Sequence, residues 1–162
     1  MIKLLRVDHR LLHGQVIYGW INNLDVDCIL IPSNTIVNDK IRFNALKMTK
    51  PASVKKLIIK NIADSIAAIN SGVTDKYKLL IVTETVKDAC ELANKCDRIH
   101  SINLGGVKER QNTKKINKSV YLNKDEIASL KQELVNKKEV FIQAVPDEKR
   151  IEVTPDLLKG DD

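Results

Sequence analysis

The chain of 162 residues is poor in aromatic residues, glycine, proline and cysteine. Phe, Trp and Tyr make up 4% of the residues, and there are six glycines, four prolines and three cysteines. So little glycine and proline, beside 43% hydrophobic residues, excludes a collagen-like, low-complexity or largely disordered chain. No apolar run is long enough to cross a bilayer, and no signal peptide is recognisable. We therefore expect a soluble, globular protein.

The three cysteines, Cys28, Cys90 and Cys96, are odd in number and show no close paired spacing. This pattern argues against a disulfide framework and favours reduced thiols, as in cytoplasmic proteins. Cys28 lies in an apolar run, so we expect it in the core.

Lys and Arg number 27 against 21 Asp and Glu, which gives a net charge of +6. A positive surface favours contact with an acidic partner. The basic residues are scattered and aromatic residues are few, so a basic face for an acidic protein is at least as well supported as nucleic-acid binding.

Short apolar runs alternate with helical patterns along the chain. Strands are expected at 1–5, 28–31, 54–59, 78–82, 98–103, 119–122 and 140–145, with a final edge strand at 150–153; helices are expected at 14–22, 38–48, 61–70, 86–95 and 123–136. This alternation predicts an α/β three-layer sandwich, in which helices cover both faces of a mostly parallel sheet. We expect one domain over residues 1–158 and a flexible tail over 159–162.

Two further expectations follow from the pattern. In the helix at 38–48, Ile41, Ala45 and Met48 share a helical face and are expected to point inward. In open parallel sheets the site lies beyond the carboxyl ends of the strands. The turns at 8–13, 32–34, 83–85 and 103–106 are therefore the candidate positions.

The segment from Asp8 to Gly14 places His13 directly before a helix and Arg10 three residues earlier. A neutral imidazole is a good nucleophile toward phosphorus, and the positive end of a helix disfavours imidazolium. Arg10 and the amides that follow Gly14 could hold the transferred group. Spacing alone leaves an equal alternative, in which His13 is a capping residue and Arg10 a surface cation.

The sequence leaves the roles of several other candidate residues undecided. Asp8 could orient an imidazole, or pair with Arg10 or Arg6 and hold the loop. The residues 83–85 could donate to an oxyanion, although a helix cap explains them more simply. The segment 103–106 ends in two glycines and is either an anion-binding turn or an ordinary tight turn.

Two other functions are considered. His9 and His13 could form a metal pair, but four-residue spacing brings two imidazoles together only within one helix, and no third ligand follows at a telling distance. The basic stretch 108–118 could contact nucleic acid.

Residues 6–16 resemble the phosphorylation-site motif of the IIB component of mannose-family sugar phosphotransferase systems, the mannose/fructose/sorbose group. The resemblance extends through Trp20, Asn38-Asp39, Leu46-Lys47-Met48 before Pro51, residues 102–106 and Val145-Pro146, so it covers almost the whole chain. It implies a mostly parallel sheet with an antiparallel edge strand.

The resemblance also implies a function. His13 is expected to accept a phosphoryl group on Nδ1 from a phosphohistidine of a IIA partner and to pass it to a hexose held by membrane components IIC and IID. Arg10 matches the active-site arginine, whereas His9 stands where an acidic residue often occurs. Asp8 is assigned to orientation.

The remaining assignments concern phosphate contacts and partners. Gly14, Gln15, Thr83 and Gly105 are assigned to phosphate binding, and no metal, cofactor or nucleic acid is expected. No IIA domain precedes Met1, which implies a stand-alone IIB protein. We expect it in the cytoplasm, peripherally associated with the inner face of the plasma membrane, with a homodimer possible.

Overall fold

The structure, a computed structural model, describes residues 1–159. The main sheet consists of β1 (Ile2–Asp8), β2 (Cys28–Pro32), β3 (Lys56–Lys60), β4 (Leu79–Thr83), β5 (Ser101–Gly106), β8 (Glu139–Ile142) and β9 (Ile151–Glu152). The helices are α1 (Gly14–Leu24), α2 (Lys40–Met48), α3 (Ile62–Ser71), α4 (Val86–Lys95) and α5 (Lys124–Val135), with 3-10 turns η1 (Ile36–Asn38) and η2 (Leu157–Lys159). A hairpin of β6 (Lys114–Asn117) and β7 (Val120–Leu122) stands apart.

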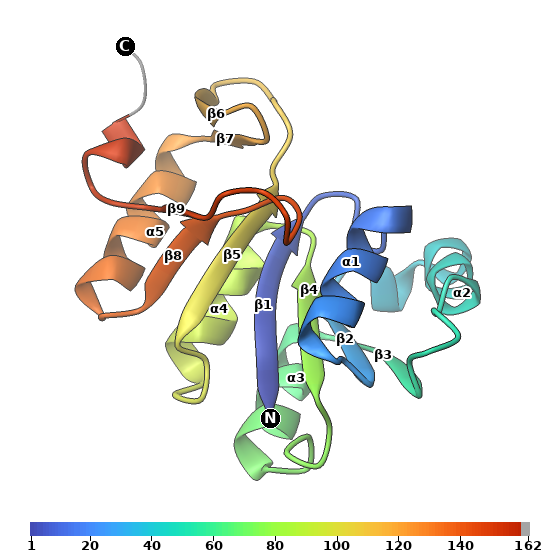
Figure 1. Cartoon of the computed structure of the whole chain (residues 1–162). Coiled ribbons are helices and arrows are strands. Elements are labelled where there is room, and N and C mark those ends of the chain that lie inside the picture. Colours follow the sequence, from blue (N-terminus) through green and yellow to red (C-terminus); the bar gives the residue numbers. More distant parts are fainter. Residues whose placement is uncertain (160–162) are drawn as a thin grey trace.

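The seven strands of the main sheet lie in the order β3-β2-β4-β1-β5-β8-β9. The ladders from β3 to β8 are parallel, and β9 pairs antiparallel with β8. The three-layer α/β fold with an antiparallel edge strand is thus confirmed (Figure 1). The expected tail beyond Lys159 lies outside the described residues, and Lys159 itself belongs to η2.

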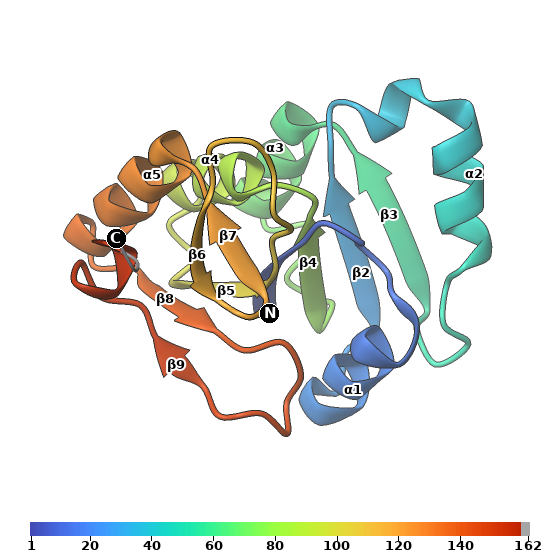
Figure 2. The ribbon, with the colours of Figure 1, turned by 90° about the horizontal axis from the view of Figure 1, so that it is seen from above.

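Two apolar cores lie on opposite faces of the sheet. Successive strand residues point to opposite faces, so Leu79 and Ile81 of β4 pack in the core beneath α3, α4 and α5, whereas Leu80 and Val82 pack in the core beneath α1. Figure 2 shows α1 alone on its side of the sheet, with α2 lying beyond the edge strand β3. Cys28, Cys90 and Cys96 are free and buried, and burial raises the pKa of Cys90 to about 12.

The helices differ in whether a side chain caps their N-terminus. At the starts of α2, α3, α4 and α5, a side chain accepts a hydrogen bond from a backbone amide of the first turn; these caps are Asp39, Asn61, Thr85 and Asn123. Helix α1 begins after His13, which makes no such hydrogen bond, and its first turn contains no acidic residue. The first-turn amides of α1 therefore lack the side-chain acceptor that the other helices possess.

The inward positions expected for α2 are wrong. Ile41 and Met48 are 84% and 86% exposed, and Ala45 is exposed as well. Phe43 and Leu46 pack against the core instead. The physical reason is position, because α2 lies beside the sheet edge rather than over its face (Figure 2) and contacts the core along a narrow strip.

Two other segments differ from expectation. Gly105 and Gly106 belong to strand β5, not to a turn after it, and the chain continues into a bridge between Val107 and Val120. The stretch 108–118, for which the sequence pattern predicts no strand or helix, contains β6, which pairs antiparallel with β7. Across residues 1–159, no helix has both the length and the hydropathy that crossing a bilayer would require.

Candidate functional site

The loop between β1 and α1 leaves the carboxyl edge of the sheet and carries His13 to the surface. His13 is exposed and has an extended backbone at the residue before the helix. Gly14 follows with a φ of +43°, a left-handed conformation that glycine adopts at little cost, and with open space where a Cβ would stand. The imidazole thus lies accessible beside the start of α1.

Leu11 fixes the middle of this loop. Its φ is +57°, which is unfavourable for a residue with a Cβ. Its side chain is only 3% exposed and packs in the core beneath α1, and its amide donates to the Asp8 carbonyl at 2.9 Å. Burial therefore holds the loop in a conformation that the isolated chain would avoid.

Asp8 pairs with both neighbouring arginines. One carboxylate oxygen accepts from the Arg10 amide at 3.0 Å and from Arg10 Nε at 3.1 Å, and the other accepts from Arg6 Nη2 at 3.1 Å. Burial opposes ionisation of Asp8, but the hydrogen bonds from Arg10 and the charge of Arg6 outweigh this effect and lower its pKa. Of the roles left open by the sequence, the structure thus places Asp8 in the pairing role, where it orients Arg10.

Arg6 is fully buried in β1 and was not singled out as a site residue from the sequence. Its guanidinium donates to Asn103 Oδ1 at 2.7 Å, to the Gln143 carbonyl at 3.1 Å and to the Ala144 carbonyl at 2.9 Å. Trp20 covers it, with Cζ 5.5 Å from the ring centroid. This buried cation anchors Asp8 from beneath, and Asp8 in turn anchors the partly exposed Arg10.

Gly105 and Thr83, both assigned to phosphate binding, have other positions. A Cβ on Gly105 would lie 2.1 Å from Arg6 Cζ, so this glycine makes room for the buried guanidinium. Thr83 is fully buried, and its hydroxyl donates to the Thr85 carbonyl at 3.0 Å. Both residues therefore make their contacts inside the protein, whereas Gly14 and Gln15 are exposed next to His13.

His9 and His13 have different surroundings. His9 lies in the turn before α1, and it lines a small cavity of about 220 Å³ together with Glu84, Lys108 and Arg110. Among residues 1–159, no group of three or more His, Cys, Asp or Glu side chains is arranged to hold a metal ion.

The stretch 108–118, considered for nucleic-acid contact, is partly neutralised by acidic residues. Arg110 pairs with Glu126 at 2.8 Å, and Lys118 pairs with Glu148 at 3.4 Å. These ion pairs reduce the positive charge that a phosphate backbone would meet.

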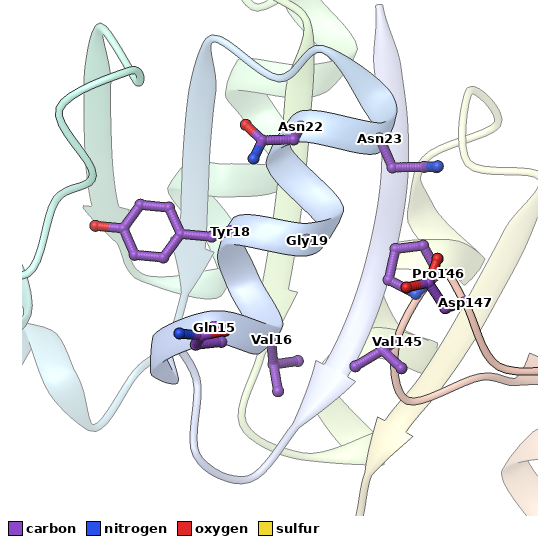
Figure 3. A pocket seen from close by; sticks show the side chains of 9 residues that line it. All are labelled: Gln15, Val16, Tyr18, Gly19, Asn22, Asn23, Val145, Pro146 and Asp147. Atoms are coloured by element: carbon purple, nitrogen blue, oxygen red, sulfur yellow. The ribbon is translucent and has the colours of Figure 1, made fainter.

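An open groove of about 720 Å³ begins at Gln15 and follows the outer face of α1. Its opposite wall is the segment after β8, and Figure 3 shows Val16 of the helix facing Val145 of this wall. Carboxamides, a phenol and a carboxylate are among the other lining residues, which are Gln15, Tyr18, Gly19, Asn22, Asn23, Pro146 and Asp147. The groove thus adjoins His13 and offers both apolar and hydrogen-bonding groups.

The comparisons with known proteins agree with one another. The family model of the PTS system sorbose subfamily IIB component matches residues 2–161. A probable phosphotransferase enzyme IIB component of Streptococcus pyogenes is 30% identical over 161 residues, covering 95% of this chain and 98% of that protein. The sorbose-specific EIIB component of Lacticaseibacillus casei is 30% identical over 132 residues, covering 82% of this chain and 80% of that protein.

A solved structure supports the same fold. The IIBSor domain of the sorbose permease from Klebsiella pneumoniae superposes with a TM-score of 0.90, at 21% identity, covering 98% of this chain and 96% of that domain. The family model and the curated relatives, together with this fold, show that the chain belongs to the sorbose subfamily of IIB components of sugar phosphotransferase systems.

Proposed function

We propose that His13 is the phosphoryl acceptor of this IIB component. The observation that supports this most directly is the start of α1, where an exposed imidazole stands at a helix N-terminus that no side chain caps. Phosphate is stabilised at such positions by backbone amides and by the helix dipole. The amides of Gly14 and Gln15 are the donors closest in sequence to the imidazole.

The transfer exchanges one nitrogen–phosphorus bond for another. As His13 Nδ1 bonds to phosphorus, the bond from phosphorus to the donor's histidine nitrogen breaks, and that nitrogen keeps the electron pair. Such transfers pass through a loose transition state and depend on positioning and charge stabilisation. The neutral imidazole needs no deprotonation by a second residue, because its lone pair is already available.

Arg10 supplies the stabilising charge in this proposal. Asp8 engages Arg10 Nε and Nη2, and within residues 1–159 no hydrogen bond engages its Nη1. The guanidinium is therefore held from one side, with a donor left over for a phosphoryl oxygen. Asp8 has a positioning role, because it acts through Arg10.

The donor in this proposal is a phosphorylated IIA protein, and the acceptor is a hexose held by membrane components IIC and IID. The protein then works in the cytoplasm at the membrane periphery. Its catalytic groups need neither nucleotide nor metal, since the phosphoryl group arrives already activated on nitrogen.

Mapping the phosphate tests the assignment cleanly, because the chain has only three histidines: His9, His13 and His100. The protein is incubated with phosphorylated IIA, and the label is located by peptide mapping under alkaline conditions. His13→Ala should abolish labelling, whereas the control variants His9→Ala and His100→Ala should retain it. Labelling that persists in His13→Ala would overturn the proposal.

A further inference from the structure

The net charge of the protein is concentrated beside one edge of the sheet. Residues 28–63, between Asp27 and Asp64, contain seven basic residues and one acidic residue, Asp39. This segment therefore carries the whole net charge of +6, and the remainder holds 20 basic and 20 acidic residues. The segment comprises β2, η1, α2 and β3, so the charge gathers at the β3 edge (Figure 2).

The lysines of this edge are uncompensated. Within residues 1–159, none of them forms an ion pair with a carboxylate, whereas Arg42, the seventh basic residue of the segment, pairs with Glu84. The six lysines are Lys40, Lys47, Lys50, Lys55, Lys56 and Lys60. Such a surface attracts a polyanion over about one Debye length, roughly 8 Å at physiological salt.

Helix α2 adds an apolar stripe to this charge. Ile41, Ala45 and Met48 are spaced by four and three residues, which places them on one helical face, and all three are exposed. The opposite face contributes Phe43 and Leu46 to the core. No residue of α2 is buried, so the helix projects from the edge with apolar side chains directed outward. Lys40 and Lys47 lie on one flank of the stripe, where Lys47 donates to the Leu57 carbonyl, and Arg42 lies on the other flank, paired with Glu84.

We propose that α2 and its flanking lysines bind the surface of an anionic lipid bilayer. Ile41 and Met48 enter the interfacial region, and the lysine ammonium groups contact lipid phosphates. Apolar side chains on one helical face flanked by lysines are the composition of interfacial membrane-binding helices. A fluid bilayer can adapt its shape to single apolar side chains that project from a helix. An acidic protein would need a matching pocket for each of them, so a bilayer is the better partner.

The position of α2 connects this surface with the proposed function, on which this part of the inference rests. Val16 in the first turn of α1 packs against the same core as Phe43 and Leu46 of α2, and Figure 1 shows α2 on the side of the molecule where α1 begins after His13. Binding through α2 would therefore hold the imidazole close to the membrane that contains the sugar acceptor. Restricting diffusion to the membrane surface raises the frequency of encounters with a membrane-embedded partner.

Co-sedimentation with vesicles tests the proposal. The full protein is mixed with vesicles of equal parts phosphatidylglycerol and phosphatidylcholine, and separately with phosphatidylcholine alone. We expect salt-sensitive binding to the anionic vesicles only. Lys40→Gln with Lys55→Gln should weaken partitioning about 25-fold, at roughly five-fold per lysine, and Ile41→Ser with Met48→Ser about tenfold.

Matched controls lie on α5, at the other end of the sheet. Val135 is 73% exposed, and Lys124 and Lys131 are exposed, so Val135→Ser and Lys124→Gln with Lys131→Gln repeat the same chemical changes there. These control variants should bind anionic vesicles like the unaltered protein. Circular dichroism of each variant verifies that its overall helix content is unchanged.

Three results would overturn the inference: no binding to anionic vesicles, equal binding to both kinds of vesicle, or equal loss in the α5 variants. Binding only to vesicles that contain the permease would assign this surface to a protein partner instead. Phosphorylation of His13 in solution is measured in parallel and should be unchanged in the α2 variants. The lipid inference and the proposed function can therefore fail separately.

Discussion

Gly105 faces the guanidinium of Arg6 across two neighbouring strands, so closely that a Cβ on this glycine would lie 2.3 Å from Arg6 Nη1 and Nη2. The arginine holds Asp8, and Asp8 holds Arg10. Gly105 has no side chain, and the space it leaves fixes the position of Arg6 and, through Asp8, that of the partly exposed Arg10.

The first prediction concerns this contact. Gly105→Ala should lower the free energy of unfolding by about 3 kcal/mol, because the methyl group displaces a buried cation from its partners. Urea unfolding measures the change. Gly19→Ala is the matched control, since its Cβ would meet Pro146 Cδ at an ordinary 3.5 Å, and a helical alanine should be neutral or slightly stabilising. Equal stability of the two variants would show that Arg6 moves aside without loss.

The second prediction separates transfer from stability. Arg10→Ala should slow phosphorylation of His13 about 100-fold, because a donor to the developing charge is lost. Its unfolding free energy should fall by only about 1 to 2 kcal/mol, because Asp8 loses the Arg10 Nε and Nη2 hydrogen bonds but keeps Arg6 and the amide of residue 10. Rapid-quench measurement of phosphoryl transfer gives the rate, and Arg10→Lys should restore part of it. An unchanged rate in Arg10→Ala would remove Arg10 from the mechanism.

The third prediction follows from the lowered pKa of Asp8. A carboxyl group whose folded pKa lies below its unfolded value of about 3.9 stabilises the fold above that pH, and this stabilisation is lost as the pH falls through the folded pKa. Asp8→Asn should therefore be less stable by about 3 kcal/mol at neutral pH, because Arg6 loses its charged partner. The difference should shrink in acid, as measured by urea unfolding from pH 7 downward.

Asp25→Asn serves as the control for this pH series. Asp25 pairs with Lys78, but its side chain is 82% exposed, and surface pairs contribute little. A loss in Asp25→Asn as large as that in Asp8→Asn would contradict the special role of the buried pair.

The fourth prediction concerns Glu133 in α5. It is fully buried, and within residues 1–159 neither carboxylate oxygen has a hydrogen-bond partner. Burial raises its pKa, so the unfolded chain releases this proton at a lower pH than the folded protein does. Stability should then decline as the pH rises above about 4.3, the ordinary glutamate value, until the folded group ionises.

Replacing Glu133 tests the direction of this change of stability with pH. Glu133→Met should raise the free energy of unfolding by about 1 kcal/mol at neutral pH and flatten its decline with pH. Gln132→Met, a change at the exposed neighbouring position, controls for helix propensity. A destabilised Glu133→Met variant would show that the carboxylate has a compensating interaction.

The parts of the fold that depend on local pattern were predictable from the sequence. A continuous apolar run such as 28–31 is typical of a strand covered on both faces, and β2 is buried throughout. The cap at Asp39 and the helix end at Gly72 were also predictable, because both depend on near neighbours in the chain. The position of His13 before α1 followed from the same kind of local evidence.

The parts that depend on distant contacts were not predictable in this way. Apart from Asp8, partners of Arg6 lie 97 residues away at Asn103 and 137 residues away at Gln143, so no local pattern indicates them. An arginine within an apolar strand was the available signal, since a buried cation requires partners. The inward face of α2 was predicted wrongly for a similar reason. Its packing against the sheet edge, which the sequence pattern does not show, determines which face of the helix is covered.

The uncapped start of α1 has a consequence for the energetics of the carrier. In the proposed function, a phosphoryl group on His13 would accept hydrogen bonds from amides that find no side-chain acceptor in the unmodified protein. These hydrogen bonds would then contribute to the equilibrium between donor and carrier. The affinity of this protein for its phosphate would thus depend on the free backbone amides at the start of α1 as well as on the reactivity of a ring nitrogen.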